Sequence, residues 1–184
     1  MIKPGEIQQK AREAGVRDHQ IEKDYVLSWI LKGIAQNENL SKVFVFKGGT
    51  VLKKFYFENY RYSEDLDFTL LDDSITNEQI FESFKQTFEF VREEANIPLE
   101  IIDNNEHEDG GINFYISYIG PLGGQRSNKK VKVDISGSEK MEFEPVNKDA
   151  FKVYSDIDDY QLLCYTLEEV LVEKMRSVIQ RMQA

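Results

Sequence analysis

The stretch Val43-Phe44-Val45-Phe46-Lys47-Gly48-Gly49-Thr50 is followed, after residues 51–62, by Ser63-Glu64-Asp65-Leu66-Asp67-Phe68-Thr69-Leu70-Leu71. Both stretches are rich in β-branched and aromatic residues, which favour strands. The two glycines end the first strand, and the amphipathic segment between the stretches indicates a short helix. Together they predict a strand, a glycine turn, a helix and a second strand, and this unit organises the rest of the chain.

Two acidic residues lie on the second predicted strand. Side chains alternate between the faces of a strand, so Asp65 and Asp67 are predicted to share one face while Leu66 and Phe68 point into the core. Two carboxylates with no basic residue between them repel each other unless a cation lies there. Mg²⁺ is held in proteins by one or two carboxylates plus substrate phosphates. The pair therefore indicates a site for Mg²⁺, with Mn²⁺ as the alternative ion.

The glycine turn is suited to binding phosphate. Glycines let the backbone turn tightly and approach a ligand closely. A helix expected to begin near Thr50 would direct its free N–H groups and positive dipole end at an anion. Thr50 is expected to be the N-cap of this helix or a hydroxyl ligand of a phosphate. A phosphate site beside a two-carboxylate metal site is typical of an enzyme that uses nucleoside triphosphates.

Each signal has a simpler interpretation when it is taken alone. A Gly-Gly turn is more often a tight connection than a phosphate site. An Asp-x-Asp pair is commonly a solvated strand face, and glycosyltransferases use a similar pair for nucleotide sugars. The order of strand, turn, helix and acidic strand favours the triphosphate enzyme over these alternatives.

A longer pattern is formed by Lys47-Gly48-Gly49-Thr50, Leu52, Arg61 and Ser63-Glu64-Asp65-Leu66-Asp67-Phe68. It resembles the signature of the AbiEii-type nucleotidyltransferases, which are toxins of type IV toxin–antitoxin and abortive-infection systems. These belong to the DNA polymerase β-like nucleotidyltransferase superfamily, in which a glycine turn precedes an Asp-x-Asp strand and a third acid lies on a later strand. The resemblance implies that the nucleotide is bound by Lys47, Gly48, Gly49, Thr50 and Ser63.

The third acid is expected on the strand Val131-Lys132-Val133-Asp134-Ile135-Ser136. Its apolar residues share one face, and Lys132, Asp134 and Ser136 share the other. A lone Asp in a strand is usually a surface residue, but an acid flanked by β-branched residues resembles the superfamily's third acid. The resemblance implies that Asp134 completes a catalytic metal site with Asp65 and Asp67.

The last helix is predicted over 160–182 from its apolar spacing. Glu169 and Glu173 on it are expected to be solvated.

The string Leu167–Arg176, with Arg181 after it, again resembles the AbiEii family, in which this helix places a lysine at the nucleotide phosphates. The resemblance implies that Lys174 is a catalytic phosphate ligand and that Arg176 and Arg181 are weaker candidates. Family members usually continue into a further helical region, so we expect this chain to be short relative to them.

The other segments predict an α+β fold, with a nucleotidyltransferase-like mixed β-sheet flanked by helices and with helices at both termini. We expect a sheet of about four or five strands covered on one side. Glu22 and Asp24 are expected on the charged outer face of an early helix. Further helices are predicted over 2–14, 20–35 and 77–95, and further strands over 98–102 and 112–119. We expect one nucleotidyltransferase domain over 1–184, with N-terminal helices in 1–40, a catalytic core in 41–155 and the C-terminal helix in 156–184.

Composition excludes several classes of protein. The formal net charge of −10 argues against broad, non-specific nucleic-acid binding, although the basic segment 125–132 leaves room for a local RNA contact. The single cysteine, Cys164, excludes an internal disulfide, and His19 and His107 lack neighbours at the spacing of zinc ligands. No apolar run approaches the ~20 residues of a membrane span, and the N-terminus lacks a signal-peptide segment. We expect a cytoplasmic protein with no membrane association.

The predicted reaction is transfer of a nucleoside monophosphate from an NTP to an acceptor, with release of pyrophosphate. Two metals held by Asp65 and Asp67 would bridge the phosphates, Asp134 would hold metal near the acceptor and act as general base, and Lys174 and Lys47 would neutralise phosphate charge. The family resemblance implies a toxin that modifies RNA at the tRNA acceptor end and is neutralised by a cognate antitoxin. The alternatives are a protein or small-molecule acceptor, a non-catalytic nucleotide- or partner-binding module, and a glycosyltransferase.

Overall fold

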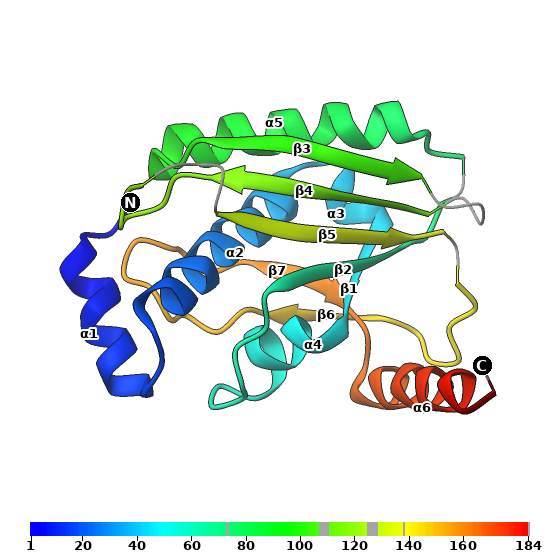
Figure 1. Cartoon of the computed structure of the whole chain (residues 1–184). Coiled ribbons are helices and arrows are strands. Elements are labelled where there is room, and N and C mark those ends of the chain that lie inside the picture. Colours follow the sequence, from blue (N-terminus) through cyan, green and yellow to red (C-terminus); the bar gives the residue numbers. More distant parts are fainter. Residues whose placement is uncertain (73, 107–110, 125–128, 138, 184) are drawn as a thin grey trace.

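The computed structural model describes residues 1–72, 74–106, 111–124, 129–137 and 139–183. His107 and part of the basic segment, residues 125–128, lie outside the described residues. The elements follow one another as shown in Figure 1. They are α1 (Pro4–Ala14), α2 (Asp18–Gln36), α3 (Leu40–Val43), β1 (Phe44–Lys47), α4 (Gly48–Val51), the π-helix η1 (Leu52–Tyr56), β2 (Asp65–Leu70), α5 (Asn77–Ala95), β3 (Leu99–Glu106), β4 (Ile112–Tyr118), β5 (Lys130–Ser136), β6 (Val146–Asp149), β7 (Gln161–Cys164) and α6 (Leu167–Gln183).

Within the described residues, seven strands form one mixed sheet in the order β3-β4-β5-β2-β1-β7-β6. The pairs β5–β2 and β1–β7 are parallel, and the other neighbours are antiparallel. The expectation of an α+β fold is confirmed, but the expected four or five strands are too few. β6 lies in a segment for which no strand was predicted, and β3 extends four residues beyond the predicted end of its strand, from 102 to 106.

The strand β7 replaces the predicted start of the last helix. Cys164 pairs with Phe46 of β1, and Leu162 and Leu163 pair with β6. The apolar residues at 162–164 therefore complete the sheet rather than a helix face. The prediction of a helix from Tyr160 is wrong, and α6 begins at Leu167.

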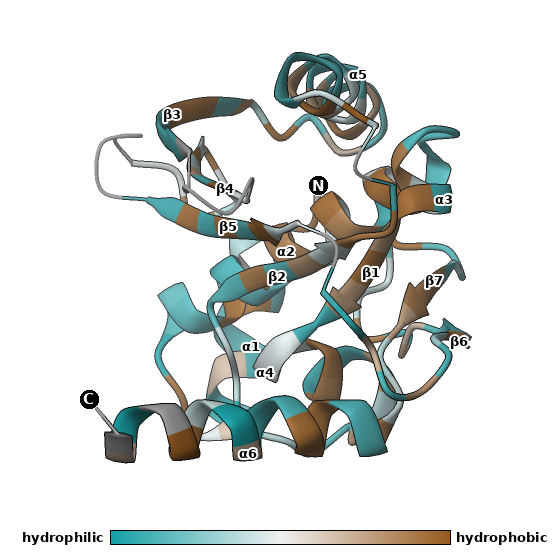
Figure 2. Cartoon of the chain, turned by 90° about the vertical axis from the view of Figure 1, so that its right-hand side faces the viewer, coloured by the Kyte–Doolittle hydropathy of each residue, from teal (hydrophilic) through white to brown (hydrophobic). Residues whose placement is uncertain are grey.

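An aromatic core joins one face of the sheet to α5. Phe44 of β1 lies 5.0 Å from Phe68 and 6.1 Å from Phe84, and Phe84 lies 5.0 Å from Phe114 of β4, measured between ring centroids. The apolar residues of α5 belong to this core, and Phe84 and Val91 among them are fully buried. Figures 1 and 2 place α2 and α5 on this same side of the sheet.

Two buried carboxylates of α2 correct the expectation that Glu22 and Asp24 face outward. Glu22 is fully buried and accepts hydrogen bonds from the ammonium of Lys129, at 2.6 Å, and from the backbone N–H of Leu122. Asp24 is buried and pairs with Lys54 of η1 at 2.7 Å. Both acids therefore bind segments distant in sequence to α2, which holds η1 and the start of β5 in place around the sheet.

The helix α6 packs by its polar side and turns an apolar side outward (Figure 2). Leu171, Met175 and Met182 are more than half exposed. Glu169 is buried, and its Oε2 accepts hydrogen bonds from the backbone N–H groups of Glu142 and Phe143. The expectation that Glu169 is solvated is wrong, because its carboxylate fixes α6 to the preceding loop. No helix of the described residues has the length and apolar character needed to span a membrane.

Candidate active site

A row of polar side chains crosses the centre of the sheet. Lys47, Asp67, Asp134 and Asn113 are successive Cα partners on β1, β2, β5 and β4. Residues directly opposite one another in a sheet point to the same face, so these side chains share one face. Neighbouring strands lie about 4.8 Å apart, which makes Asp67 and Asp134 adjacent.

A second row on the same face lies two residues back along β2. It contains Asp65, Lys132 of β5 and Tyr115 of β4, again as successive Cα partners. The intervening residues Leu66 and Val133 are fully buried on the opposite face. The alternation expected from the sequence is confirmed, and the fold brings all three predicted acids to one face.

The first glycine of the turn is required by Asp67. Gly48 has a φ of 76°, in the left-handed region. A Cβ atom at this position would lie 2.9 Å from Cγ of Asp67 and closer still to its Oδ2. Gly48 therefore gives Asp67 the space to lie directly against the turn, which is a stronger requirement than that of an ordinary tight connection.

The second glycine packs against the segment that leads into β2. A Cβ atom at Gly49 would lie 3.2 Å from Oγ of Ser63 and 3.8 Å from Nη2 of Arg61. Thr50 is buried, and its hydroxyl donates a hydrogen bond of 2.6 Å to the backbone carbonyl of Asp65. The helix begins at Gly48 with Lys47 as its N-cap, so the expectation that Thr50 is the N-cap is wrong. Thr50 instead holds the first residue of the acidic strand.

The electrostatic surroundings of Asp67 are unfavourable for its negative charge. Burial, followed by the charges of Asp65, Asp134 and Glu173, raises the pKa of Asp67 to about 6, and Lys47 opposes this shift. A positive ion among these groups would relieve the repulsion and lower the pKa of Asp67.

Asp134 has a lysine partner in the structure. Nζ of Lys132 lies 2.8 Å from Oδ2 of Asp134, and the hydrogen bond between them, with the charges of the nearby acids, raises the pKa of Lys132. Within the described ranges, no group of three His, Cys, Asp or Glu side chains is arranged to hold a metal ion. The oxygen donors nevertheless fit a hard divalent cation in their chemistry, and a shared ion requires the Asp134 carboxylate to turn from Lys132.

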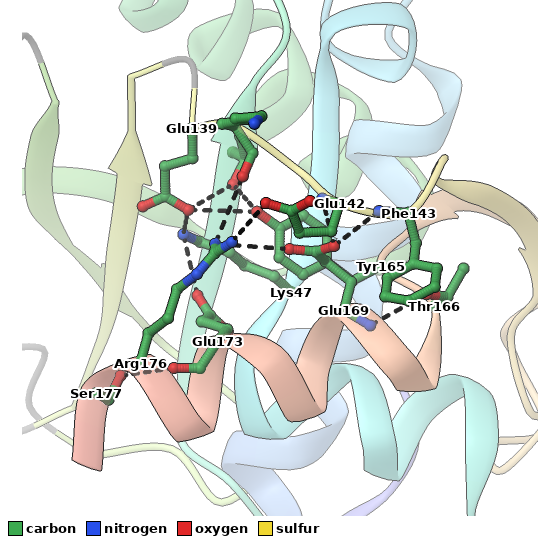
Figure 3. A network of polar contacts seen from close by, with 12 residues as sticks. Lys47, Glu139, Glu142, Phe143, Tyr165, Thr166, Glu169, Glu173, Arg176 and Ser177 are labelled. Carbon is green, nitrogen blue, oxygen red and sulfur yellow. Dashed lines mark hydrogen bonds and ion pairs between the residues drawn. The ribbon is translucent and has the colours of Figure 1, made fainter. Parts of the chain in front are cut away.

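The buried Lys47 is the centre of a polar network (Figure 3). Its ammonium lies 2.8 Å from Glu139, 3.2 Å from Glu173 of α6 and 3.0 Å from Oγ of Ser136. Burial lowers the pKa of Lys47, but the hydrogen bond to Glu139 and the charges of both glutamates outweigh it and raise the pKa overall. Two carboxylates therefore neutralise Lys47 and tie α6 to β1.

Arg176 lies on the anchored side of α6. Its guanidinium is 3.1 Å from Glu142 and 3.9 Å from Glu169, as Figure 3 shows for this part of the network. These contacts tie the helix to the loop before β6. Arg176 is therefore engaged in ion pairs with the helix anchor, and Arg181, further along α6, is exposed.

One pocket, of about 340 Å³, joins the glycine turn, the acids and α6. Six predicted site residues contribute to its lining, and Asp65, Thr50, Ser63 and Arg176 do not. The lining residues are Lys47, Gly48, Gly49, Asp67, Asp134, Ser136, Glu139, Glu173, Lys174 and Ser177. Lys174 is exposed and reaches this pocket from α6, so the fold brings it to the side occupied by the acids.

Three charged residues of the site were not predicted as site residues, and the expectation that Glu173 is solvated is wrong because it pairs with Lys47. Glu139 and Glu173 pair with Lys47, and Lys132 pairs with Asp134. The alternation of β5 places Lys132 beside Asp134, so this neighbour was readable from the sequence. Glu139 and Glu173 carry no local signal, because their partner is more than ninety residues away in the chain.

Comparison with protein families gives a match over most of the chain. The model of the family described as nucleotidyl transferase AbiEii toxin, Type IV TA system, matches residues 29–184. No curated protein matches the chain.

A solved structure supports the fold. The chain is similar to the crystal structure of JHP933 from Helicobacter pylori, with 19% sequence identity and a TM-score of 0.55. The similarity covers 86% of this chain and 56% of that chain, so the present chain corresponds to little more than half of JHP933.

Proposed function

Because the chain belongs to the AbiEii nucleotidyl transferase toxin family, we propose that it transfers a nucleoside monophosphate from an NTP to an RNA acceptor and releases pyrophosphate. One observation carries this proposal. Asp65, Asp67 and Asp134 share one face of the sheet, and Gly48 lies against Asp67 at the turn where phosphate is expected. Family membership supports the reaction class, and this arrangement supports the choice of residues.

Asp65, Asp67 and Asp134 are the proposed ligands of Mg²⁺ or Mn²⁺. All three present carboxylate oxygens, which such hard ions prefer. Burial and the neighbouring acidic charges raise the pKa of Asp67, and a cation would relieve the repulsion. When bound, the ion supplies positive charge that stabilises the phosphoryl group during transfer. Asp134 stands on β5, which is separated by β2 from the strand that leads into the glycine turn, so we assign it the proton of the attacking hydroxyl.

The triphosphate is proposed to lie in the pocket between the glycine turn and α6. Gly48 and Gly49 offer backbone N–H groups without side chains that would block approach. Lys174 is the proposed phosphate ligand on α6, because it is exposed in the pocket, whereas Lys47 is already neutralised by two glutamates. In this assignment Lys47 holds α6 in position through Glu173, and Thr50 holds Asp65 in position.

Ser63 and Arg176 complete the proposed nucleotide site. Ser63 lies against Gly49 at the edge of the turn, and Arg176 fixes α6, which carries Lys174. Arg176 would contact phosphate only after leaving Glu142. We therefore assign it mainly to positioning the helix.

The biological setting proposed is that of a toxin that modifies RNA, with the tRNA acceptor end as its target and a cognate antitoxin as its partner. NTP and tRNA are cytoplasmic substrates, which places the proposed reaction in the cytoplasm. Support comes from the family, whose description is of a toxin of a type IV toxin–antitoxin system.

The proposal is tested by incubating the purified chain with Mg²⁺, each radiolabelled NTP in turn and total RNA. A D65A/D67A variant serves as the control. Label that enters an RNA band only with the intact protein is the expected result, and it identifies the nucleotide. Label on a polypeptide or a small molecule would contradict an RNA acceptor while retaining nucleotidyl transfer.

A non-catalytic nucleotide-binding module is the second candidate function. It is favoured by the ion pair between Lys132 and Asp134, which keeps one of the three carboxylates engaged. NTP binding measured by calorimetry, together with no label transfer under any condition, would support this candidate over the enzyme.

A further inference from the structure

A half-buried tyrosine and an exposed lysine lie on the active face of the sheet, beyond the acids and outside the proposed nucleotide pocket. Tyr115 of β4 is half-buried, and the ammonium of the exposed Lys130 of β5 lies over its ring at 4.2 Å from the centroid. No hydrogen-bond partner for the Tyr115 hydroxyl is found among the described residues. In Figure 1 β4 and β5 lie in front of α2, so no described helix covers this part of the face. Figure 2, turned by 90°, shows α2 and α5 on the opposite side.

The order of the strands places this pair on the acceptor side of the reaction. In phosphoryl transfer the attacking and leaving groups lie roughly in line on opposite sides of the phosphorus. The glycine turn follows β1, whereas the acids stand on β2 and β5, and β4 lies beyond them. If the leaving pyrophosphate occupies the turn, the attacking hydroxyl must approach from the β4 side. Tyr115 stands in the same row as Lys132 and Asp65, two strands from the latter.

We propose that Tyr115 and Lys130 bind the 3′ end of a single-stranded nucleic acid and position its terminal hydroxyl for attack. This inference rests on the proposed function. An aromatic ring beside a cation is the combination by which proteins hold single strands, with the ring stacking on a base and the cation contacting the backbone phosphate. The cation over the Tyr115 ring is held less strongly than a stacked base, so a base can displace the Lys130 ammonium toward the phosphate.

The small size of the contact that Tyr115 and Lys130 offer also agrees with the net negative charge of the chain. The formal net charge of −10 opposes contact along a long duplex, which needs an extended cationic surface. A short single-stranded end requires only a few cationic contacts, and stacking supplies the rest of the affinity. The two residues therefore suit an acceptor end better than the body of a folded RNA.

The test measures binding of a short, fluorescently labelled single-stranded RNA by anisotropy, and the Michaelis constant for RNA in the transfer assay. The variants are Y115L, Y115F and K130Q. The matched control is K148Q, because the ammonium of Lys148 lies over the ring of Tyr56 at a similar distance, 4.3 Å from the centroid, but on β6, at the far edge of the sheet. Thermal unfolding of each variant separates local effects from misfolding.

We expect Y115L to weaken RNA binding and to raise the Michaelis constant for RNA by about tenfold, and Y115F to bind almost as well as the original protein because it still stacks. K130Q should flatten the salt dependence of binding by about one phosphate contact, and K148Q should change neither quantity. NTP affinity should stay constant throughout, because the NTP lies on the α6 side.

Two results would overturn the inference: unchanged RNA binding in both Y115L and K130Q, or equal effects of K130Q and K148Q. Its failure is distinguishable from failure of the proposed function. RNA binding that depends on Tyr115 without any label transfer supports the acceptor site and refutes the transfer. Transfer to RNA with an unchanged Michaelis constant in Y115L refutes the acceptor site alone.

Discussion

Replacing Gly48 with alanine should disable the active site while leaving the fold largely intact. Gly48 has a φ of 76°, which costs a residue with a side chain about 1–2 kcal/mol. The new methyl group would also lie 2.9 Å from Cγ of Asp67. Because the neighbouring backbone belongs to β1 and β2, the Asp67 carboxylate has to move away from the turn.

A substitution at a matched glycine separates the cost of backbone strain from the cost of the steric clash with Asp67. Gly15, at the C-cap of α1, has a φ of 66° and no atom within 4 Å of a Cβ built on it. G15A therefore measures backbone strain alone, about 1–2 kcal/mol. G48A should cost a further ~1–3 kcal/mol, the usual penalty of overpacking. For a chain of this length, each kcal/mol corresponds to about 2–4 °C in the unfolding midpoint.

The assay combines chemical unfolding of G15A, G48A, D67A and the double variant G48A/D67A with NTP-dependent label transfer. G48A should unfold more readily than G15A and lose at least about 100-fold in transfer rate, because the Asp67 carboxylate leaves its place. G48A/D67A should lose less unfolding free energy than the sum of the losses in the two single variants, since removing the carboxylate relieves the clash. The reasoning is refuted if G48A unfolds like G15A and keeps its transfer activity.

Three further predictions concern the charged groups. Asp67→Asn should raise the unfolding free energy at pH 7 by about 1–2 kcal/mol after allowance for solvent screening. Because the folded pKa of Asp67 is about 6, its ionisation destabilises the fold as pH rises from about 4 to 6. Denaturant titrations should show the gain in stability at pH 7 and not at pH 4. Lys54→Met should lower the unfolding free energy by about 3–5 kcal/mol, since it leaves the carboxylate of Asp24 buried without its partner, and an undiminished denaturation midpoint would contradict this. Lys174→Gln should weaken NTP binding about tenfold in calorimetry without altering the unfolding midpoint, whereas Lys85→Gln, an exposed substitution on α5, should leave NTP affinity unchanged.

The central unit of the fold was predictable because its signals are local. Alternation along one strand fixes the common face of Asp65 and Asp67, and the glycines of the turn precede them at short range. Asp134 could be identified as a candidate from its apolar neighbours in the sequence, although its place beside Asp67 depends on the parallel pairing of β5 with β2.

The errors arose where distant partners decide the structure. The apolar residues at 162–164 fit a helix as well as a strand, and only their pairing with β1 and β6 selects the strand. Glu22, Asp24 and Glu169 were expected at the surface because acids usually lie there. Each is buried against a donor far away in sequence, namely Lys129, Lys54 and the backbone of 142–143, and no periodicity reveals such a donor.

The ion pairs of the site were the feature least predictable from the sequence. The sequence predicted Lys47 as a phosphate ligand, and in the fold its ammonium lies between Glu139 and Glu173. The contact with Glu173 follows from the docking of α6 on the sheet, and the contact with Glu139 follows from the course of the chain after β5. The role of Lys174, by comparison, depends only on which side of one helix faces the pocket.

The claim that Asp65, Asp67 and Asp134 act as one site is tested most directly by Mn²⁺ binding. Electron paramagnetic resonance can count bound Mn²⁺ in the original protein and in D65N, D67N and D134N, with a non-hydrolysable NTP present. The account predicts binding in the original protein and a loss of at least about tenfold in affinity in each variant, because each removes an oxygen ligand. Unchanged Mn²⁺ affinity in D67N and D134N would contradict it.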